Sequence, residues 1–152
     1  LKTSDLIADN NSILFSNNKN EFFSLDINTG ILNWKQKINS NLKSTLVDNI
    51  IFAISMEGFL IVIDNHSGNI IRITDIFRQF KKKKRSKIKP VGFIVGSENI
   101  YLTTDHGRLM IIDIITGRTK SMLKIDNDKI SRPFVLNQNL YIIKENSIIR
   151  LN

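Results

Sequence analysis

The sequence lacks several residues on which common classes of site depend. It contains no cysteine, so it can form neither a disulfide nor a thiolate metal site. No run of apolar residues approaches the roughly 18 residues that a membrane-spanning helix needs. The chain begins at Leu1, with neither a methionine nor a signal-peptide pattern, and we therefore expect further sequence upstream.

Acidic residues are missing from one segment, residues 78–89, which contains eight basic residues and no acidic one. The net charge of +8 is therefore concentrated there, and the rest of the chain is neutral. Such a run is commonly a solvated insertion, and it also suits an anionic surface or an acidic partner. Aromatic residues near it are limited to Phe77 and Phe80, so we do not expect nucleic acid as a partner. The candidate contacts to an anionic membrane surface are Lys81, Lys82, Lys83, Lys84, Arg85, Lys87 and Lys89.

A repeated phrase organises the chain. In each copy a turn residue precedes an apolar run, an aspartate follows the turn residue by six positions, and a glycine follows the aspartate by four. The three copies are Asn20, Asp26 and Gly30, then Gly58, Asp64 and Gly68, then Gly107, Asp113 and Gly117. A fourth copy begins at Asn146 and places Asn152 at the aspartate position. A repeat of this kind determines the fold class.

Each position of the phrase has a physical reason. Glycine supplies the positive φ that a hairpin turn needs, and asparagine tolerates it. The apolar run is typical of a strand buried on both faces. The aspartate can accept hydrogen bonds from backbone N–H groups of a D-x-x-[T/S]-G turn, with the threonine or serine adding its hydroxyl. We interpret these aspartates as turn residues rather than catalytic carboxylates.

The repeating units of the chain predict an all-β fold. Each is about 40 residues long with four short strands, which is typical of four-stranded antiparallel β-propeller blades. Residues 1–152 are predicted to form a single partial propeller with a basic insertion at residues 75–89. Within this insertion only residues 75–80 favour a helical turn, with Asp75 as its N-cap. The predicted blades are residues 4–39, 44–74, 90–125 and an incomplete 131–152.

One copy of the phrase carries a family resemblance. Leu25-Asp26-Ile27-Asn28-Thr29-Gly30-Ile31-Leu32-Asn33-Trp34 resembles the L-D-x-x-T-G-x-x-x-W repeat of pyrroloquinoline-quinone-type (PQQ-type) propellers. In that family the tryptophan docks one blade onto its neighbour, and the resemblance implies this role for Trp34. The second and third copies depart from the pattern, with Arg72 and Ser121 at the tryptophan position.

The last unit, which runs on from Ser131-Arg132-Pro133-Phe134-Val135 and ends after three strands, is similar to the propeller lipoprotein of the outer-membrane β-barrel assembly machinery (BamB-like). This resemblance implies about half of an eight-bladed ring, the C-terminal half, whose missing strand comes from the N-terminus. It also implies a periplasmic, outer-membrane-associated protein, with barrel-assembly components and nascent β-strand segments as partners. We expect that these 152 residues alone do not close a ring.

No set of residues points to catalysis. His66 and His106 lie in separate turns, and the repeated aspartates lie one blade apart, whereas a metal site needs three or four converging ligands. We predict no catalytic, metal or cofactor-binding residues and no cofactor. The favoured function is a non-enzymatic scaffold for protein–protein interaction, and the alternative is a fragment of a PQQ-dependent dehydrogenase, which shares the repeat.

Overall fold

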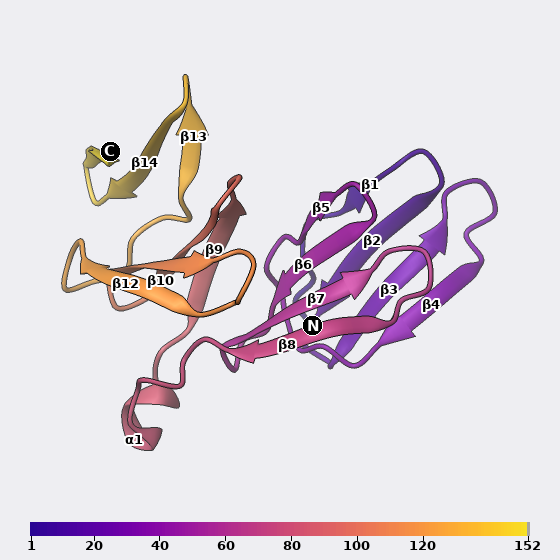
Figure 1. Ribbon diagram of the computed structural model, residues 1–152, viewed down its shortest axis with the longest axis horizontal. Helices are drawn as coiled ribbons and strands as arrows, with labels where there is room; N and C mark the ends of the chain where they lie inside the picture. Colours follow the sequence, from indigo (N-terminus) through magenta and orange to yellow (C-terminus); the bar gives the residue numbers. More distant parts are fainter. Residues whose placement is uncertain (152) are drawn as a thin grey trace. The chain divides into compact units, whose positions relative to one another are not determined.

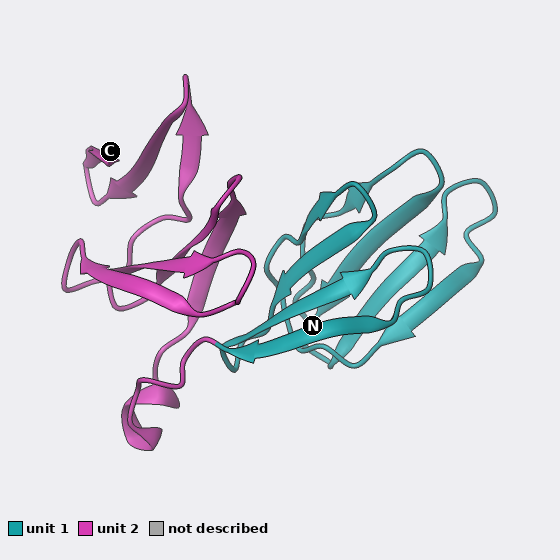
Figure 2. Ribbon diagram, viewed as in Figure 1, with its two compact units in different colours: residues 1–75 teal, residues 76–152 magenta. Residues whose placement is uncertain are grey.

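The computed structural model describes residues 1–151, which form antiparallel β-sheets and one short helix (Figure 1). Three sheets have four strands and one has three, and within each sheet the strands pair in the order in which they follow one another in sequence. The all-β prediction is therefore confirmed. The chain divides into two compact units, Leu1–Asp75 (unit 1) and Ile76–Asn152 (unit 2) (Figure 2). Asn152, expected at an aspartate position of the repeat, lies outside the described residues.

Unit 1 contains two four-stranded meanders. The first consists of β1 (Ile7–Ala8), β2 (Ser12–Asn17), β3 (Glu21–Asp26) and β4 (Leu32–Gln36). The second consists of β5 (Thr45–Val47), β6 (Ile50–Ile54), β7 (Phe59–Asp64) and β8 (Ile70–Asp75). The apolar runs form the central strands, as expected for a strand covered on both faces, and β7 buries four successive side chains.

Unit 2 contains the helix, one four-stranded meander and the three-stranded sheet. The helix is α1 (Lys82–Arg85), and the larger sheet consists of β9 (Pro90–Val95), β10 (Asn99–Thr104), β11 (Arg108–Asp113) and β12 (Thr119–Lys124). The smaller sheet consists of β13 (Phe134–Leu136), β14 (Asn139–Lys144) and β15 (Ser147–Leu151). Leu109, Ile130 and Ile142 form a buried apolar cluster in this unit.

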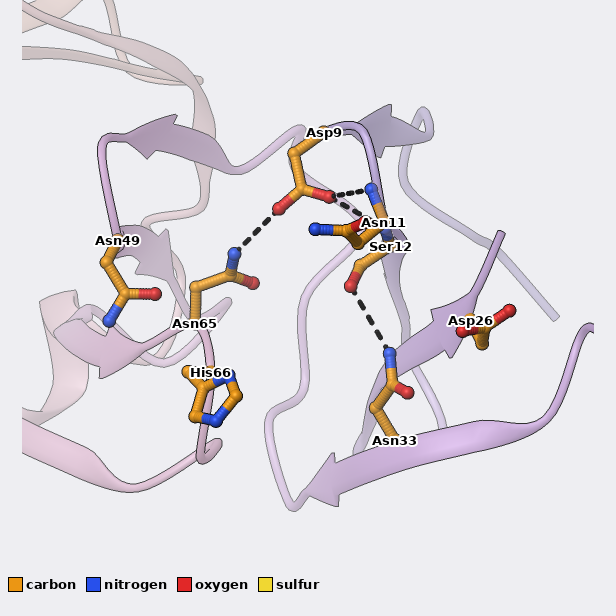
Figure 3. Close-up of a pocket in the computed structure, with 8 residues that line it drawn as sticks. All are labelled: Asp9, Asn11, Ser12, Asp26, Asn33, Asn49, Asn65 and His66. Atoms are coloured by element: carbon orange, nitrogen blue, oxygen red, sulfur yellow. Dashed lines mark hydrogen bonds between the residues drawn. The ribbon is translucent and has the colours of Figure 1, made fainter. Parts of the chain in front are cut away.

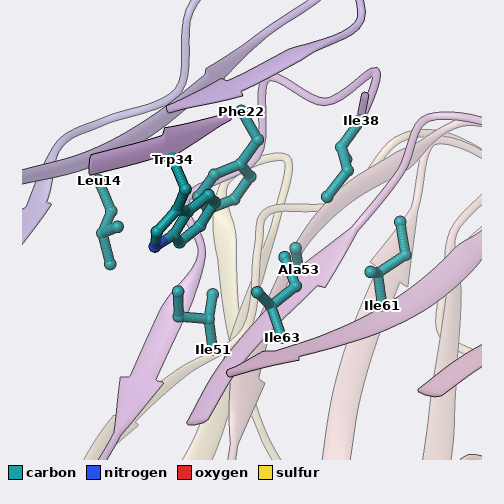
Figure 4. Close-up of a cluster of buried hydrophobic side chains, with 8 residues drawn as sticks. All are labelled: Leu14, Phe22, Trp34, Ile38, Ile51, Ala53, Ile61 and Ile63. Carbon is teal, nitrogen blue, oxygen red and sulfur yellow. The ribbon is translucent and has the colours of Figure 1, made fainter. Parts of the chain in front are cut away.

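The core of unit 1 draws on both of its sheets (Figure 4). Phe22 of β3 stacks on Trp34 of β4, with ring centroids 5.6 Å apart. Ile51 of β6 and Ile63 of β7 pack in the same cluster and are completely buried. This apolar layer fixes the two sheets against each other, so their turns hold a defined geometry.

A β-bulge recurs at one position of the repeat. The register between the third and fourth strands shifts at Ser24/Leu25, at Val62/Ile63 and at Ile111/Ile112. In each sheet this lies one and two residues before the repeated aspartate. The extra residue increases the local twist and re-aims the strand into the turn that follows. The sequence repeat is therefore also a repeat of backbone geometry.

The expected helical segment at 75–80 is wrong. Asp75 ends β8, residues 76–79 form a turn, and the only helix within residues 1–151 is the single turn α1. Ile76 and Phe77 are 1% and 0% exposed, so burial of their side chains fixes this part of the chain instead of helix propensity. No helix of the described chain is long and apolar enough to cross a membrane.

Candidate functional site

The D-x-x-[T/S]-G turns share one set of hydrogen bonds in all three copies: the aspartate accepts the N–H and the hydroxyl of the threonine or serine three residues later. Asp26 Oδ1 accepts the backbone N–H groups of Asn28 and Thr29, each at 2.9 Å, and the Thr29 hydroxyl at 3.1 Å. Asp113 Oδ1 accepts the equivalent bonds at 2.8–3.2 Å, and Asp64 Oδ1 accepts the Ser67 N–H and hydroxyl. The closing glycine N–H then donates to the aspartate carbonyl, at 2.8 Å in each copy. The aspartates therefore complete turns.

These bonds also set the charge of the turns. The largest influence on each aspartate is the N–H donated by the threonine or serine three residues later, and it holds the pKa below its ordinary value. A carboxylate with a lowered pKa is ionised at neutral pH, so it carries no proton and acts only as a hydrogen-bond acceptor. This is the opposite of what a general acid or base at neutral pH requires.

The turn before each central strand also repeats. Asn20, Gly58 and Gly107 have φ of 65°, 93° and 71°. Gly58 N–H donates to Ser55 O at 3.1 Å, the geometry of a tight turn followed by a left-handed residue. The equivalent expectation for Asn146 is wrong, because the left-handed residue of the fourth hairpin is Glu145, with φ of 46°. Lys144 pairs directly with Ser147, so this hairpin has a two-residue turn.

The first residue of these turns was missed by sequence reasoning. Asn17, Ser55 and Thr104 are buried polar residues, each followed by a left-handed residue three positions later. Their side-chain oxygens accept backbone N–H groups inside the turn, for example Phe59 N–H on Ser55 Oγ at 3.1 Å. Such bonds replace those that the backbone loses at the hairpin. A hydroxyl or amide residue three positions before each turn residue is the signal that could have revealed them.

Trp34 lies between the two sheets of unit 1 and is 9% exposed. Its indole N–H donates to Asn65 O at 2.8 Å, in the β7–β8 turn. Its ring covers Gly68 so closely that a Cβ there would lie 2.5 Å from Trp34 Cγ. The contact of Trp34 with the Asp64–Gly68 turn thus joins the repeated motif of one sheet to that of the next.

A polar pocket of about 520 Å³ opens at the same end of unit 1 (Figure 3). It is lined by Asp9, Asn11, Ser12, Asp26, Asn33, Asn49, Asn65 and His66. Asp9 Oδ2 accepts the Asn65 amide at 2.9 Å and so links the β1–β2 turn to the β7–β8 turn. The lining suits small polar groups that exchange hydrogen bonds, but its two carboxylates already stabilise turns.

The two histidines do not meet. His66 is exposed in the β7–β8 turn of unit 1, and His106 lies in the β10–β11 turn of unit 2, with Nδ1 2.7 Å from Asp105 Oδ1. Among residues 1–151 no group of three or more His, Cys, Asp or Glu side chains has an arrangement that could hold a metal ion. Each histidine belongs to its own turn.

The basic segment forms an exposed loop in unit 2. Arg78 and Lys81–Lys84 are exposed, as are Lys87 and Lys89, whereas Arg85 is half-buried. Lys84 Nζ lies 5.8 Å from the centre of the Phe80 ring. The structure therefore brings the predicted basic residues together on one short stretch of surface.

Comparison with known proteins supports a specific kind of repeat. Residues 1–74 match the family model described as outer membrane protein assembly factor BamB. The crystal structure of BamB from Moraxella catarrhalis is similar with a TM-score of 0.76 at 13% identity, over 97% of this chain and 41% of that chain. This share is consistent with the expectation of about half of an eight-bladed ring. The comparison with curated proteins finds no match.

Two further structures share the architecture. Sqt1 of Saccharomyces cerevisiae matches with a TM-score of 0.76 at 13% identity, over 99% of this chain and 44% of that chain. The computationally designed Ika4 protein matches with a TM-score of 0.74 at 12% identity, over 98% of this chain and 89% of that chain. The chain thus spans less than half the length of BamB and of Sqt1. At such low identity these matches establish the fold and leave function to the site itself.

Proposed function

We propose that this β-propeller, whose residues 1–74 match the family model described as outer membrane protein assembly factor BamB, is a non-enzymatic scaffold of PQQ-type, BamB-like blades that binds other proteins during assembly of outer-membrane β-barrel proteins. The observation that carries the proposal is the match of residues 1–74 to the family model of that assembly factor. The same likeness supports a periplasmic location at the outer membrane. The partners in this proposal are barrel-assembly components and nascent β-strand segments.

The outer strands of the sheets supply a physical means of binding such segments. β4, β8 and β12 are each the last strand of a four-stranded sheet and pair on one side only. The other side of such a strand carries backbone N–H and C=O groups that can pair with an added strand. An unfolded β-barrel segment is itself extended and alternates apolar and polar residues, so it matches an edge of this kind.

β8 carries the most apolar of these edges. Ile71 and Ile73 lie two residues apart, so they project from the same face of the strand, and they are 56% and 54% exposed. A paired segment would bury both side chains. Backbone pairing then supplies affinity for any extended chain, and the two isoleucines select for segments with apolar residues at alternate positions.

A binding assay with a fluorescent peptide tests the proposal. The peptide is one transmembrane strand of an outer-membrane barrel, and its polarisation is measured with the 152-residue chain and with an Ile71→Lys/Ile73→Lys variant. We expect the variant to raise Kd about tenfold or more, because burying one isoleucine side chain contributes about 1.5–3 kcal/mol.

A control variant separates the edge from general surface hydrophobicity. Leu6→Lys/Ile115→Lys makes the same kind of change at two exposed residues outside the strands, 62% and 79% exposed. It should leave Kd unchanged. Equal affinity of the β8 variant and the unmodified chain would refute this mode of binding.

A further inference from the structure

We propose that the basic loop, residues 78–89, is a docking surface for anionic lipid membranes. The inference goes beyond the protein-binding role proposed above and does not depend on it. It starts from a feature that the propeller fold does not require, since the loop lies outside the strands of the four sheets.

The loop is anchored at both ends. Ile76 and Phe77 are buried just before it, and Ile88 is 2% exposed near its end. Lys89 N–H donates to Asp105 Oδ1 at 2.9 Å, which fixes the return of the chain to β9. Within unit 2, α1 extends away from the strands (Figure 1). The lysines are therefore presented on an anchored projection and not on a loose tail.

The fold of the loop keeps the charges close together. Arg85 N–H donates to Lys81 O at 2.8 Å, and the Ser86 hydroxyl donates to Lys83 O at 2.9 Å. The last turn of α1 consists only of basic residues, and the partial negative charge of a helix C-terminus offsets only a small part of their repulsion. Bringing this loop to an anionic surface relieves the remainder.

The lysines of the loop are not neutralised by the protein. In the part of the chain that the structure describes, no carboxylate forms an ion pair with Lys81–Lys84, Lys87 or Lys89. Their ammonium groups are point charges on flexible stems and lack the fixed fork of arginine. Such a cluster suits headgroups that move laterally in a membrane better than a fixed set of carboxylates on a protein. Clusters of four to eight basic residues are the sequence pattern of anionic lipid binding.

The aromatic residues of the loop argue against nucleic acid. Phe77 is fully buried, and its ring packs edge-on against Phe80, with centroids 5.4 Å apart. The ring of Phe80 is half-buried and has Lys84 Nζ over it. Phe77 therefore offers no exposed face on which a base could stack, and the Phe80 ring already has a lysine over it, whereas stacking is a main source of affinity for single strands.

Co-sedimentation with lipid vesicles tests the proposal on the whole 152-residue chain. Vesicles of phosphatidylcholine alone are compared with vesicles that also contain phosphatidylglycerol. We expect binding only to the second kind, and weaker binding as salt increases. The test variant is Lys81→Gln/Lys82→Gln/Lys83→Gln/Lys84→Gln. Each lysine near an anionic surface strengthens partitioning about fivefold, so the variant should bind on the order of a hundredfold more weakly if three of the four reach it.

Two matched variants make the result specific. Lys19→Gln/Lys43→Gln/Lys124→Gln/Lys129→Gln removes the same charge from four exposed lysines outside the loop, and it should bind nearly as well as the unmodified chain. Replacing Lys81–Lys84 with arginine keeps the charge and should keep binding. Equal losses in the two glutamine variants would overturn the proposal, because net charge alone would then explain binding.

Competition identifies the ligand. Inorganic phosphate at the lipid phosphate concentration should not displace the protein from the vesicles, and neither should a single-stranded oligothymidylate at the same phosphate concentration. Displacement by inorganic phosphate would mean that the loop binds a free anion, and displacement by the oligonucleotide would mean that it binds nucleic acid. Either result would overturn the assignment to a membrane surface.

Discussion

The contact between Trp34 and Gly68 allows a test with a built-in control. Gly68 and Gly30 close equivalent turns and have nearly equal φ, 77° and 71°. A Cβ at Gly68 would lie 2.5 Å from Trp34 Cγ and 2.9 Å from Trp34 Cβ, whereas a Cβ at Gly30 would meet no atom within 4 Å. Alanine at the two positions therefore pays the same backbone cost and differs only in the contact.

The size of the difference follows from two terms. A left-handed conformation costs a residue other than glycine about 1–2 kcal/mol, and this applies to both variants. Forcing an extra carbon into a packed contact costs about 1–3 kcal/mol, and this applies to Gly68→Ala alone. We therefore expect Gly30→Ala to destabilise unit 1 by about 1–2 kcal/mol and Gly68→Ala by about 2–5 kcal/mol.

Urea denaturation followed by Trp34 emission and by far-ultraviolet circular dichroism measures both variants. A second background, Trp34→Leu, is followed by circular dichroism alone because it contains no tryptophan. It makes room for the new carbon, so the added cost of Gly68→Ala should shrink there, whereas that of Gly30→Ala should not. If the two alanine variants differ by less than about 0.5 kcal/mol, the docking of Trp34 on the next turn does not have the tightness argued for it.

Three further predictions concern single residues. Gly107→Val should destabilise unit 2 by at least about 1–3 kcal/mol in chemical denaturation, because φ is 71° and a Cβ would lie 2.7 Å from Asp128 O; an unchanged midpoint would contradict this. Trp34→Ala should cost roughly 3–5 kcal/mol, and Trp34 emission in the unmodified protein should be blue-shifted and poorly quenched by iodide; water-like emission would count against its burial. The Ser67 N–H lowers the pKa of Asp64 below the ordinary value of an aspartate. Ionised Asp64 therefore stabilises the fold at neutral pH, and this stability is lost as pH falls through the folded pKa. When Tm is measured from about pH 7 to about pH 2.5, the Tm of Asp64→Asn should fall by less than the Tm of the unmodified chain. Parallel plots of Tm against pH for the two proteins would argue against the turn bonds.

The repeat made much of the fold predictable. The offsets of Asp26, Asp64 and Asp113 follow from turn chemistry that acts within a few residues, so sequence spacing is sufficient to place the strands around them. The same reasoning failed at Asn146, because the six-residue spacing that predicted its left-handed conformation is read along one strand and contains no information on the strand with which it pairs. The pairing of Lys144 with Ser147 shortens that turn to two residues, and strand register is not visible in the spacing of one strand.

Contacts between sheets were harder to anticipate. The resemblance implied that Trp34 docks on a neighbouring blade, but Asp9 and Asn65, whose side chains bond across the pocket, follow no periodic pattern. They are 56 residues apart, and asparagine and aspartate in turns are common for local reasons alone. The helical turn expected at residues 75–80 was wrong for a related reason. Burial of the Phe77 side chain depends on tertiary contacts, and helix propensity, which is a local property, does not contain them.

The position of the single tryptophan determines what fluorescence can report about this protein. Trp34 lies in unit 1, and unit 2 contains no tryptophan, so an emission transition follows the loss of structure in residues 1–75 only. Circular dichroism follows the strands of both units. Coincident curves would mean that the whole chain unfolds in one cooperative step, and separate curves would mean that no single free energy of unfolding describes it. Repeat proteins break into such independent segments when coupling between neighbours is weak, and one indole ring is enough to reveal it.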